Sequence, residues 1–142
     1  MKSEAQARIS INRLLEEAGW RFMPDAQGRP ATVACEHRMH GKKLTPGADF
    51  GTDFQKAPDG FVDYLLLDAN GRPVAVVEAK RERLDPLVGK EQARRYAESL
   101  GVAHIFLSNG LVHYYWNLRA GNPVRMSRFL PAAELGKAAA WR

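Results

Sequence analysis

Three residues of types that can bind a metal and position a water lie at the ends of two apolar runs. Asp63 opens the run over residues 63–68, while Glu78 and Lys80 close the run over residues 73–80. Carboxylates are preferred ligands of Mg²⁺, and a lysine can stabilise developing negative charge. If the two runs pair as strands, the sequence predicts a small polar site at one end of an otherwise apolar ladder.

The dipeptide Asn70-Gly71 predicts how the two runs pair. Asn-Gly between apolar runs is the strongest short-range hairpin signal, because a type I′ turn needs positive φ at both central residues. With these two residues at the centre, the numbers of paired residues sum to 141, as 70 and 71 do. Asp63 then lies opposite Glu78, and Lys80 shares the face of Glu78 because side chains alternate along a strand.

Such a pair of opposed carboxylates is destabilising unless something neutralises it. Mg²⁺ suits this role, since it takes one or two carboxylates and leaves its other positions to water and phosphate. The alternative interpretation is that Asp63 and Glu78 are solvated strand ends and Lys80 is a surface charge, because charged strand ends are common.

The same residues resemble the motif of the PD-(D/E)xK nucleases. In that motif an Asp at the start of one strand is followed by Glu-x-Lys at the end of the next, as Asp63 is followed by Glu78-Ala79-Lys80. The residue before Asp63 is Val62 rather than Pro, which departs from the pattern. The resemblance implies that the catalytic residues are Asp63, Glu78 and Lys80.

Other segments are similar to one subgroup, the nuclease domain at the N-terminus of the motor (R) subunit of type I restriction enzymes. Gln92 and Tyr96 match its Gln-xxx-Tyr element, and residues 4–20 resemble its first helix. Residues 108–116, with Ser-Asn-Gly and then Tyr-Tyr-Trp, are similar to its later strands. The likeness therefore covers most of the chain.

This resemblance implies a Mg²⁺-dependent endonuclease that hydrolyses double-stranded DNA in a type I restriction-modification system, with Mn²⁺ as a possible substitute. Asp63, Glu78 and the backbone carbonyl of Ala79 would hold the metal. Glu4 would assist, although it can equally stabilise the helix N-terminus through the dipole. Lys80 would position the attacking water or stabilise the transition state. In this family methylation and specificity subunits complete the complex, and a motor domain outside this sequence uses ATP.

Gln92 and Tyr96 are four residues apart in a predicted helix from Pro86 to Leu100, so they share a face. The resemblance implies that they border the catalytic site and orient Lys80 or the scissile strand. The alternative is that Tyr96 packs in the core and Gln92 lies on the surface.

The charge of the chain favours a polyanionic partner. Its formal net charge is +5 and its pI is about 9.6. Candidate DNA contacts are Lys42, Lys43, Arg81, Arg94 and Arg95. Some of these charges can instead form ion pairs along a solvated helix face, such as Glu91–Arg95.

Composition and length predict one globular domain over residues 1–142, which the resemblance makes the N-terminal part of a longer chain. No apolar run approaches the ~20 residues that span a membrane. A single cysteine, Cys35, fits a reducing cytoplasm.

The order of predicted elements is helix, three strands, helix and two strands, an α/β fold whose mixed sheet is flanked by helices. This matches the restriction-endonuclease-like αβββαβ core that the resemblance implies. The predicted ranges are helix 4–18, strand 31–38, the hairpin over 63–80, helix 86–100, and strands 102–107 and 111–118.

Two other functions remain open at this point. The first is a nuclease fold without catalysis that binds DNA or scaffolds a larger complex. The second is an unrelated α/β protein whose basic face binds RNA or an acidic protein, and it predicts no metal binding.

Overall fold

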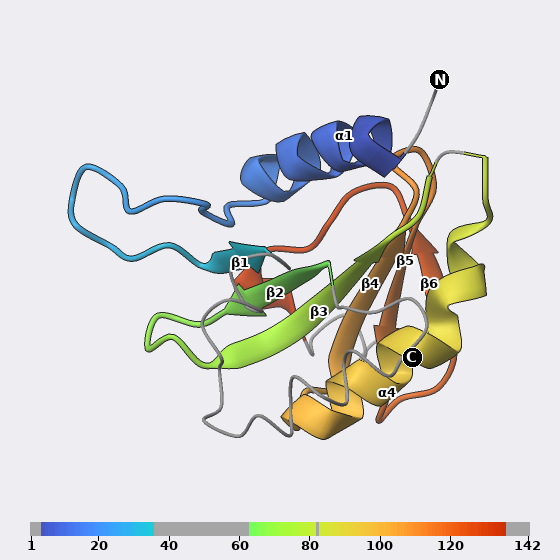
Figure 1. Ribbon diagram of the computed structural model, residues 1–142. Coiled ribbons are helices and arrows are strands. Elements are labelled where there is room, and N and C mark those ends of the chain that lie inside the picture. The colour runs from blue at the N-terminus through green and yellow to red at the C-terminus, as the bar shows by residue number, and fades with distance from the viewer. Residues whose placement is uncertain (1–3, 36–62, 82, 136–142) are drawn as a thin grey trace, which may run out of the picture.

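The computed structural model describes residues 4–35, 63–81 and 83–135. A six-stranded sheet with the strand order β1-β2-β3-β4-β5-β6 forms its centre (Figure 1). Among the strands of the described residues, only β3 and β4 pair in parallel, so the sheet is mixed, as predicted. The strands are β1 (Val33–Cys35), β2 (Tyr64–Leu67), β3 (Pro73–Ala79), β4 (His104–Ser108), β5 (His113–Asn117) and β6 (Val124–Met126).

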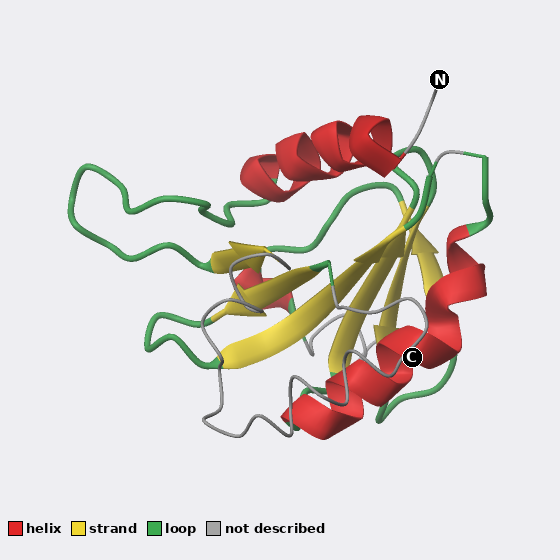
Figure 2. Ribbon diagram, in the orientation of Figure 1, coloured by secondary structure: helices red, strands yellow, loops and turns green. Residues whose placement is uncertain are grey.

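Helices cover both faces of this sheet (Figures 1 and 2). Helix α1 (Glu4–Glu17) lies on one face, and the 3-10 helix η1 (Pro86–Gly89) and α4 (Lys90–Leu100) lie on the other. A short 3-10 helix, η2 (Ala132–Glu134), follows β6. The predicted helix from residue 86 to 100 is therefore confirmed in extent, with a 3-10 first turn. No helix in the described ranges is long and apolar enough to cross a membrane.

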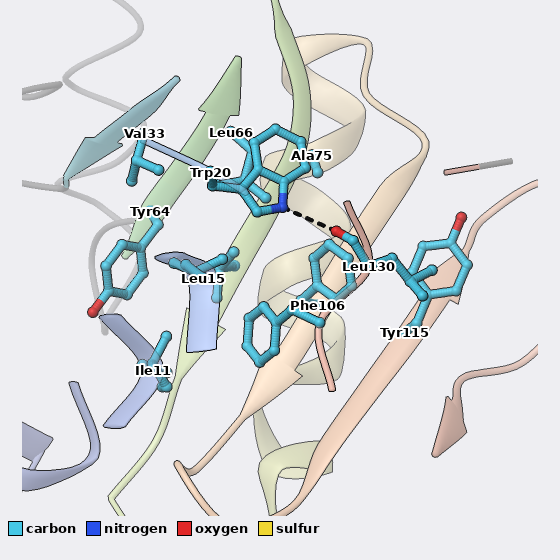
Figure 3. Close-up of a cluster of buried hydrophobic side chains, with 13 residues drawn as sticks. Ile11, Leu15, Trp20, Val33, Tyr64, Leu66, Ala75, Phe106, Tyr115 and Leu130 are labelled. Carbon is cyan, nitrogen blue, oxygen red and sulfur yellow. Dashed lines mark hydrogen bonds between the residues drawn. The ribbon is translucent and has the colours of Figure 1, made fainter. Parts of the chain in front are cut away.

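Two apolar clusters sandwich the sheet, because neighbouring residues of each strand face opposite sides. The cluster under α1 includes Ile11, Leu15, Trp20, Tyr64, Leu66, Val77, Phe106 and Phe129. The cluster under α4 includes Leu65, Val76, Ala93, Tyr96, Ala97, Ile105, Leu107 and Trp116. Figure 3 shows the first cluster, in which the indole N–H of Trp20 donates to the carbonyl of Leu130 at 2.9 Å. The two clusters hold α1 and α4 against the strands that carry the predicted site.

The turn between β2 and β3 differs from the predicted type I′ turn. The N–H of Gly71 donates to the carbonyl of Asp68 at 2.9 Å, which places Ala69 and Asn70 at the centre of the turn. Gly71 follows with a φ of 82°, and the N–H of Asp68 donates to the carbonyl of Arg72 at 2.9 Å. This is a three-residue hairpin loop, in which a glycine in the left-handed region follows the turn.

The register at the far end of the hairpin is nevertheless the predicted one. The longer loop shifts the pairing by one residue, so that Leu67 pairs with Pro73. An irregularity between Leu66 and Leu67 cancels the shift, and Tyr64 pairs with Val77, numbers that sum to 141. A single uncompensated shift would have moved every side chain to the opposite face.

Other differences concern strand limits. Strand β6 was not predicted; it has only three residues, none of them buried, and it forms the sheet edge beside β5. The described part of β1 ends at Cys35, so the predicted residues 36–38 lie outside the described residues.

Candidate active site

The carboxylate of Asp63 lies against the backbone at the carboxyl end of β3. Asp63 immediately precedes β2, and its Oδ2 accepts a hydrogen bond of 2.7 Å from the N–H of Ala79. Ala79 stands between Glu78 and Lys80, so all three predicted catalytic residues gather around one peptide segment. Asp63 and Glu78 are both buried, at 7% and 3% exposure.

Glu78 and Lys80 form an ion pair within this site. The Nζ of Lys80 is 3.4 Å from the Oε2 of Glu78, and the Lys80 side chain is mostly buried. The N–H of Lys80 donates to the carbonyl of Ser108 at 2.9 Å, which continues the pairing of β3 with β4 beyond Ala79. The parallel partner strand thus fixes the backbone that carries the lysine.

The start of α4 packs tightly against the same two side chains. A Cβ atom on Gly89 would lie 2.9 Å from Cγ of Glu78 and 3.0 Å from Cε of Lys80. Gly89 is the N-cap residue of α4, so Glu78 lies beside the positive end of the helix dipole. The sequence did not point to Gly89, which follows Glu78 by eleven positions and Lys80 by nine. Only the crossover connection from β3 to α4 brings the glycine against these two side chains.

Arg8 is a second site residue without a predicted role. Its guanidinium donates a hydrogen bond to Oδ1 of Asp63 across 55 positions of sequence. It also lies 5.8 Å from the ring centroid of Tyr64, a cation–π distance. The only sequence signal was its position one helical turn after Glu4, which places both residues on one face of α1.

Gln92 and Tyr96 are joined on α4, as their spacing predicts. The Nε2 of Gln92 donates to the phenol oxygen of Tyr96 at 3.2 Å. Tyr96 is buried in the cluster under α4, and Gln92 is half-buried one turn after Gly89. The packing role of Tyr96 is therefore established, and a role of the pair in catalysis stays a prediction.

The basic candidates divide into three groups. Lys42 and Lys43 lie outside the described residues. Arg81 and Arg95 are exposed. Arg94 is held on the helix surface by Glu91 and, at 3.3 Å, by Glu98.

The ion pair expected between Glu91 and Arg95 is therefore replaced by one between Glu91 and Arg94. Residues three apart on a helix are neighbours as well as residues four apart, so the spacing alone did not decide between the two arginines. Arg94 lowers the pKa of Glu91 by hydrogen bonding to its carboxylate.

The donor types at this site are those that a hard divalent cation takes. Asp63 and Glu78 carry carboxylate oxygens, and Ala79, whose N–H donates to Asp63, carries a backbone carbonyl. No group of three or more His, Cys, Asp or Glu side chains suited to a metal occurs in the part of the chain that the structure describes. Two carboxylates suffice for Mg²⁺, which keeps several waters. The side chain of Glu4 lies outside that part.

The family model for the N terminus of the type I restriction enzyme R protein (HSDR_N) matches residues 48–129. This range is more than half of the 142 residues, and it contains Asp63, Glu78 and Lys80. The chain belongs to this family. None of the curated proteins compared with the chain matches it.

A solved structure supports membership of the R-protein N-terminal family over nearly the full length. It is the fragment structure assigned to an HsdR subunit of a type I restriction enzyme from Vibrio vulnificus YJ016. The two chains are 25% identical with a TM-score of 0.65 over 94% of this chain. The match spans 24% of the Vibrio chain, so this sequence corresponds to about a quarter of the length of that fragment.

Proposed function

We propose that this R-protein N-terminal domain is a PD-(D/E)xK endonuclease domain that hydrolyses phosphodiester bonds of double-stranded DNA with Mg²⁺. The observation that carries the proposal is the gathering of Asp63, Glu78 and Lys80 around Ala79 at the carboxyl end of β3. Buried carboxylates beside a lysine and a helix N-terminus are costly to desolvate, and such clusters are typical of functional sites.

Each residue has a distinct role in this proposal. Asp63 and Glu78, with the carbonyl of Ala79, hold Mg²⁺, and Mn²⁺ can replace it. The bound metal supplies a Lewis acid for the phosphate. The hydrogen bond from the N–H of Ala79 fixes the orientation of Asp63 before any ligand binds.

Lys80 acts in this proposal as a positioned cation. Its Nζ is held 3.4 Å from a Glu78 oxygen at the end of β3. From there the lysine donates to the attacking water and stabilises the phosphoryl charge. Gln92 and Tyr96 support the site from α4, and Arg81 and Arg95 contact the DNA backbone.

The domain acts within a larger assembly in this proposal. Residues 1–142 form one nuclease domain of an R subunit, which works in the cytoplasm with methylation and specificity subunits. The family and the 24% span of the Vibrio chain support a larger subunit, in which a separate motor uses ATP.

A conservative substitution tests the metal site directly. Glu78→Gln keeps the volume of the side chain and removes a ligand charge, so we expect Mn²⁺ binding by calorimetry to weaken at least about tenfold. Cleavage of a supercoiled plasmid should fall by a larger factor. Glu98→Gln removes the same charge from the exposed surface of α4, and its binding and cleavage should match the wild type.

The outcomes separate the competing functions. Metal binding by the wild type without plasmid cleavage, even in the presence of the other subunits, would indicate a silent nuclease-fold module. Absence of metal binding by the wild type would refute the nuclease proposal and favour the unrelated basic α/β protein.

A further inference from the structure

The charges of the site form two matched pairs. Lys80 lies 3.4 Å from Glu78, and Arg8 binds Asp63. Two negative and two positive side chains therefore sum to zero at the end of β3. This balance explains how the fold tolerates two buried carboxylates before any metal binds.

Arg8 is held at Asp63 by the packing of α1. Gly110, in the turn after β4, approaches so closely that its Cβ would lie 3.2 Å from Cα of Ala7. One turn beyond Arg8, Asn12 accepts a hydrogen bond of 2.7 Å from the hydroxyl of Tyr64. These contacts on both sides of Arg8 fix its part of α1 to the strand ends. Its side chain is 29% exposed, whereas that of Asp63 is 10% exposed.

We propose that Arg8 is the resident counter-ion of Asp63, which a divalent cation must displace or share, so that Arg8 sets the metal affinity of the site. This inference rests on the proposed function. A guanidinium and a divalent cation at one carboxylate repel each other, and the repulsion is strong where water is largely excluded. Arg8 therefore lowers the affinity of the site for divalent cations while it holds the Asp63 carboxylate in place.

The opposite effect would follow if Arg8 merely oriented the ligand. A hydrogen bond that orients a metal ligand raises metal affinity, and its loss typically weakens binding by tenfold or more. The two roles thus predict changes of opposite sign when the charge of Arg8 is removed.

The test measures Mn²⁺ affinity in the absence of DNA by calorimetry on the 142-residue chain. We expect Arg8→Gln to bind Mn²⁺ about tenfold more tightly than the wild type. Arg8→Lys, which keeps the charge, should stay within about threefold of the wild type. Arg13→Gln removes the same charge from an exposed position of α1 and should also leave the affinity unchanged.

A double-mutant cycle assigns the effect to Asp63. In an Asp63→Asn background the tightening caused by Arg8→Gln should disappear, because the shared carboxylate is gone. Thermal unfolding of each variant with and without Mn²⁺ verifies that it is folded, and it gives a second measure of binding.

The outcomes distinguish failure of this inference from failure of the nuclease proposal. If the wild type binds Mn²⁺ and Arg8→Gln binds it equally or more weakly, Arg8 is not a competing counter-ion and the nuclease proposal stands. If neither protein binds Mn²⁺, the nuclease proposal and this inference both fall. An equal increase in Mn²⁺ affinity in Arg13→Gln would show that the effect comes from the net charge of the protein and not from Arg8, and it would also overturn the inference.

Discussion

Gly89 and Glu78 approach so closely that a Cβ atom on the glycine would lie 2.9 Å from Cγ of the glutamate. The same Cβ would lie 3.0 Å from Cε of Lys80. The backbone conformation of Gly89, with φ −94°, is open to other residues, so the constraint is one of space. The first turn of α4 therefore shapes the proposed metal site directly.

Gly89→Ala should displace the side chains of Glu78 and Lys80. We expect plasmid cleavage to fall at least about tenfold and the free energy of unfolding to fall by about 1–3 kcal/mol, as in overpacked cores. Gly101→Ala is the matched control at the other end of α4. Its φ of 73° strains an alanine and costs about 1–2 kcal/mol, yet nothing lies within 4 Å of its Cβ position. Equal cleavage by the two variants would exclude a special role for Gly89.

Tyr96→Phe separates packing from chemistry on α4. The phenylalanine keeps the buried ring and removes the hydroxyl that accepts the hydrogen bond of 3.2 Å from Gln92, so stability should change by about 1 kcal/mol. We expect cleavage to fall several-fold with metal affinity unchanged, because the freed Gln92 no longer holds its orientation. Unchanged cleavage kinetics would assign Tyr96 to the core alone.

Arg95 and Arg94 differ in how available their side chains are for contacts with DNA. Arg94 is engaged by Glu91 and Glu98, whereas Arg95 is exposed. For Arg95→Gln, the slope of log K against log salt, from fluorescence anisotropy with duplex DNA, should fall by about 1. Arg94→Gln should lower the slope less. A larger effect at Arg94 would indicate that DNA contacts the side of α4 that carries Glu91 and Glu98.

His113 should make folding stability depend on pH. Burial lowers the pKa of His113 below the ordinary value of 6.5, and its Nδ1 is 2.8 Å from Oγ of Ser108. The unfolded chain therefore takes up a proton near pH 6.5 before the folded chain does, so stability falls as the pH drops from 7 through the folded pKa.

Urea unfolding at pH 7.5, 6.0 and 5.0 measures this dependence. His113→Asn removes the titrating group, and its loss of stability over that range should be smaller than that of the wild type. His104, whose pKa is also lowered by burial, contributes separately and serves as the comparison. An identical pH profile for wild type and His113→Asn would contradict the assignment.

The spacing of apolar residues, together with the caps and glycines, predicted the two helices and the mixed sheet that they flank. Asn70-Gly71 predicted the register that sets Tyr64 against Val77, which is confirmed, and a turn type that is wrong. The register is the predicted one because the extra loop residue and the irregularity between Leu66 and Leu67 offset each other. Local signals cannot reveal such a compensation, since each half depends on the other.

The sequence by itself determined which residue types could bind a metal and that Asp63, Glu78 and Lys80 lie at the ends of two paired strands. Only the tertiary structure decided that Arg8 pairs with Asp63 and that Gly89 packs against Glu78. These contacts join segments whose approach depends on how α1 and α4 pack on opposite faces of the sheet. Packing of that kind is set by the whole core, so no local pattern of residues encodes it.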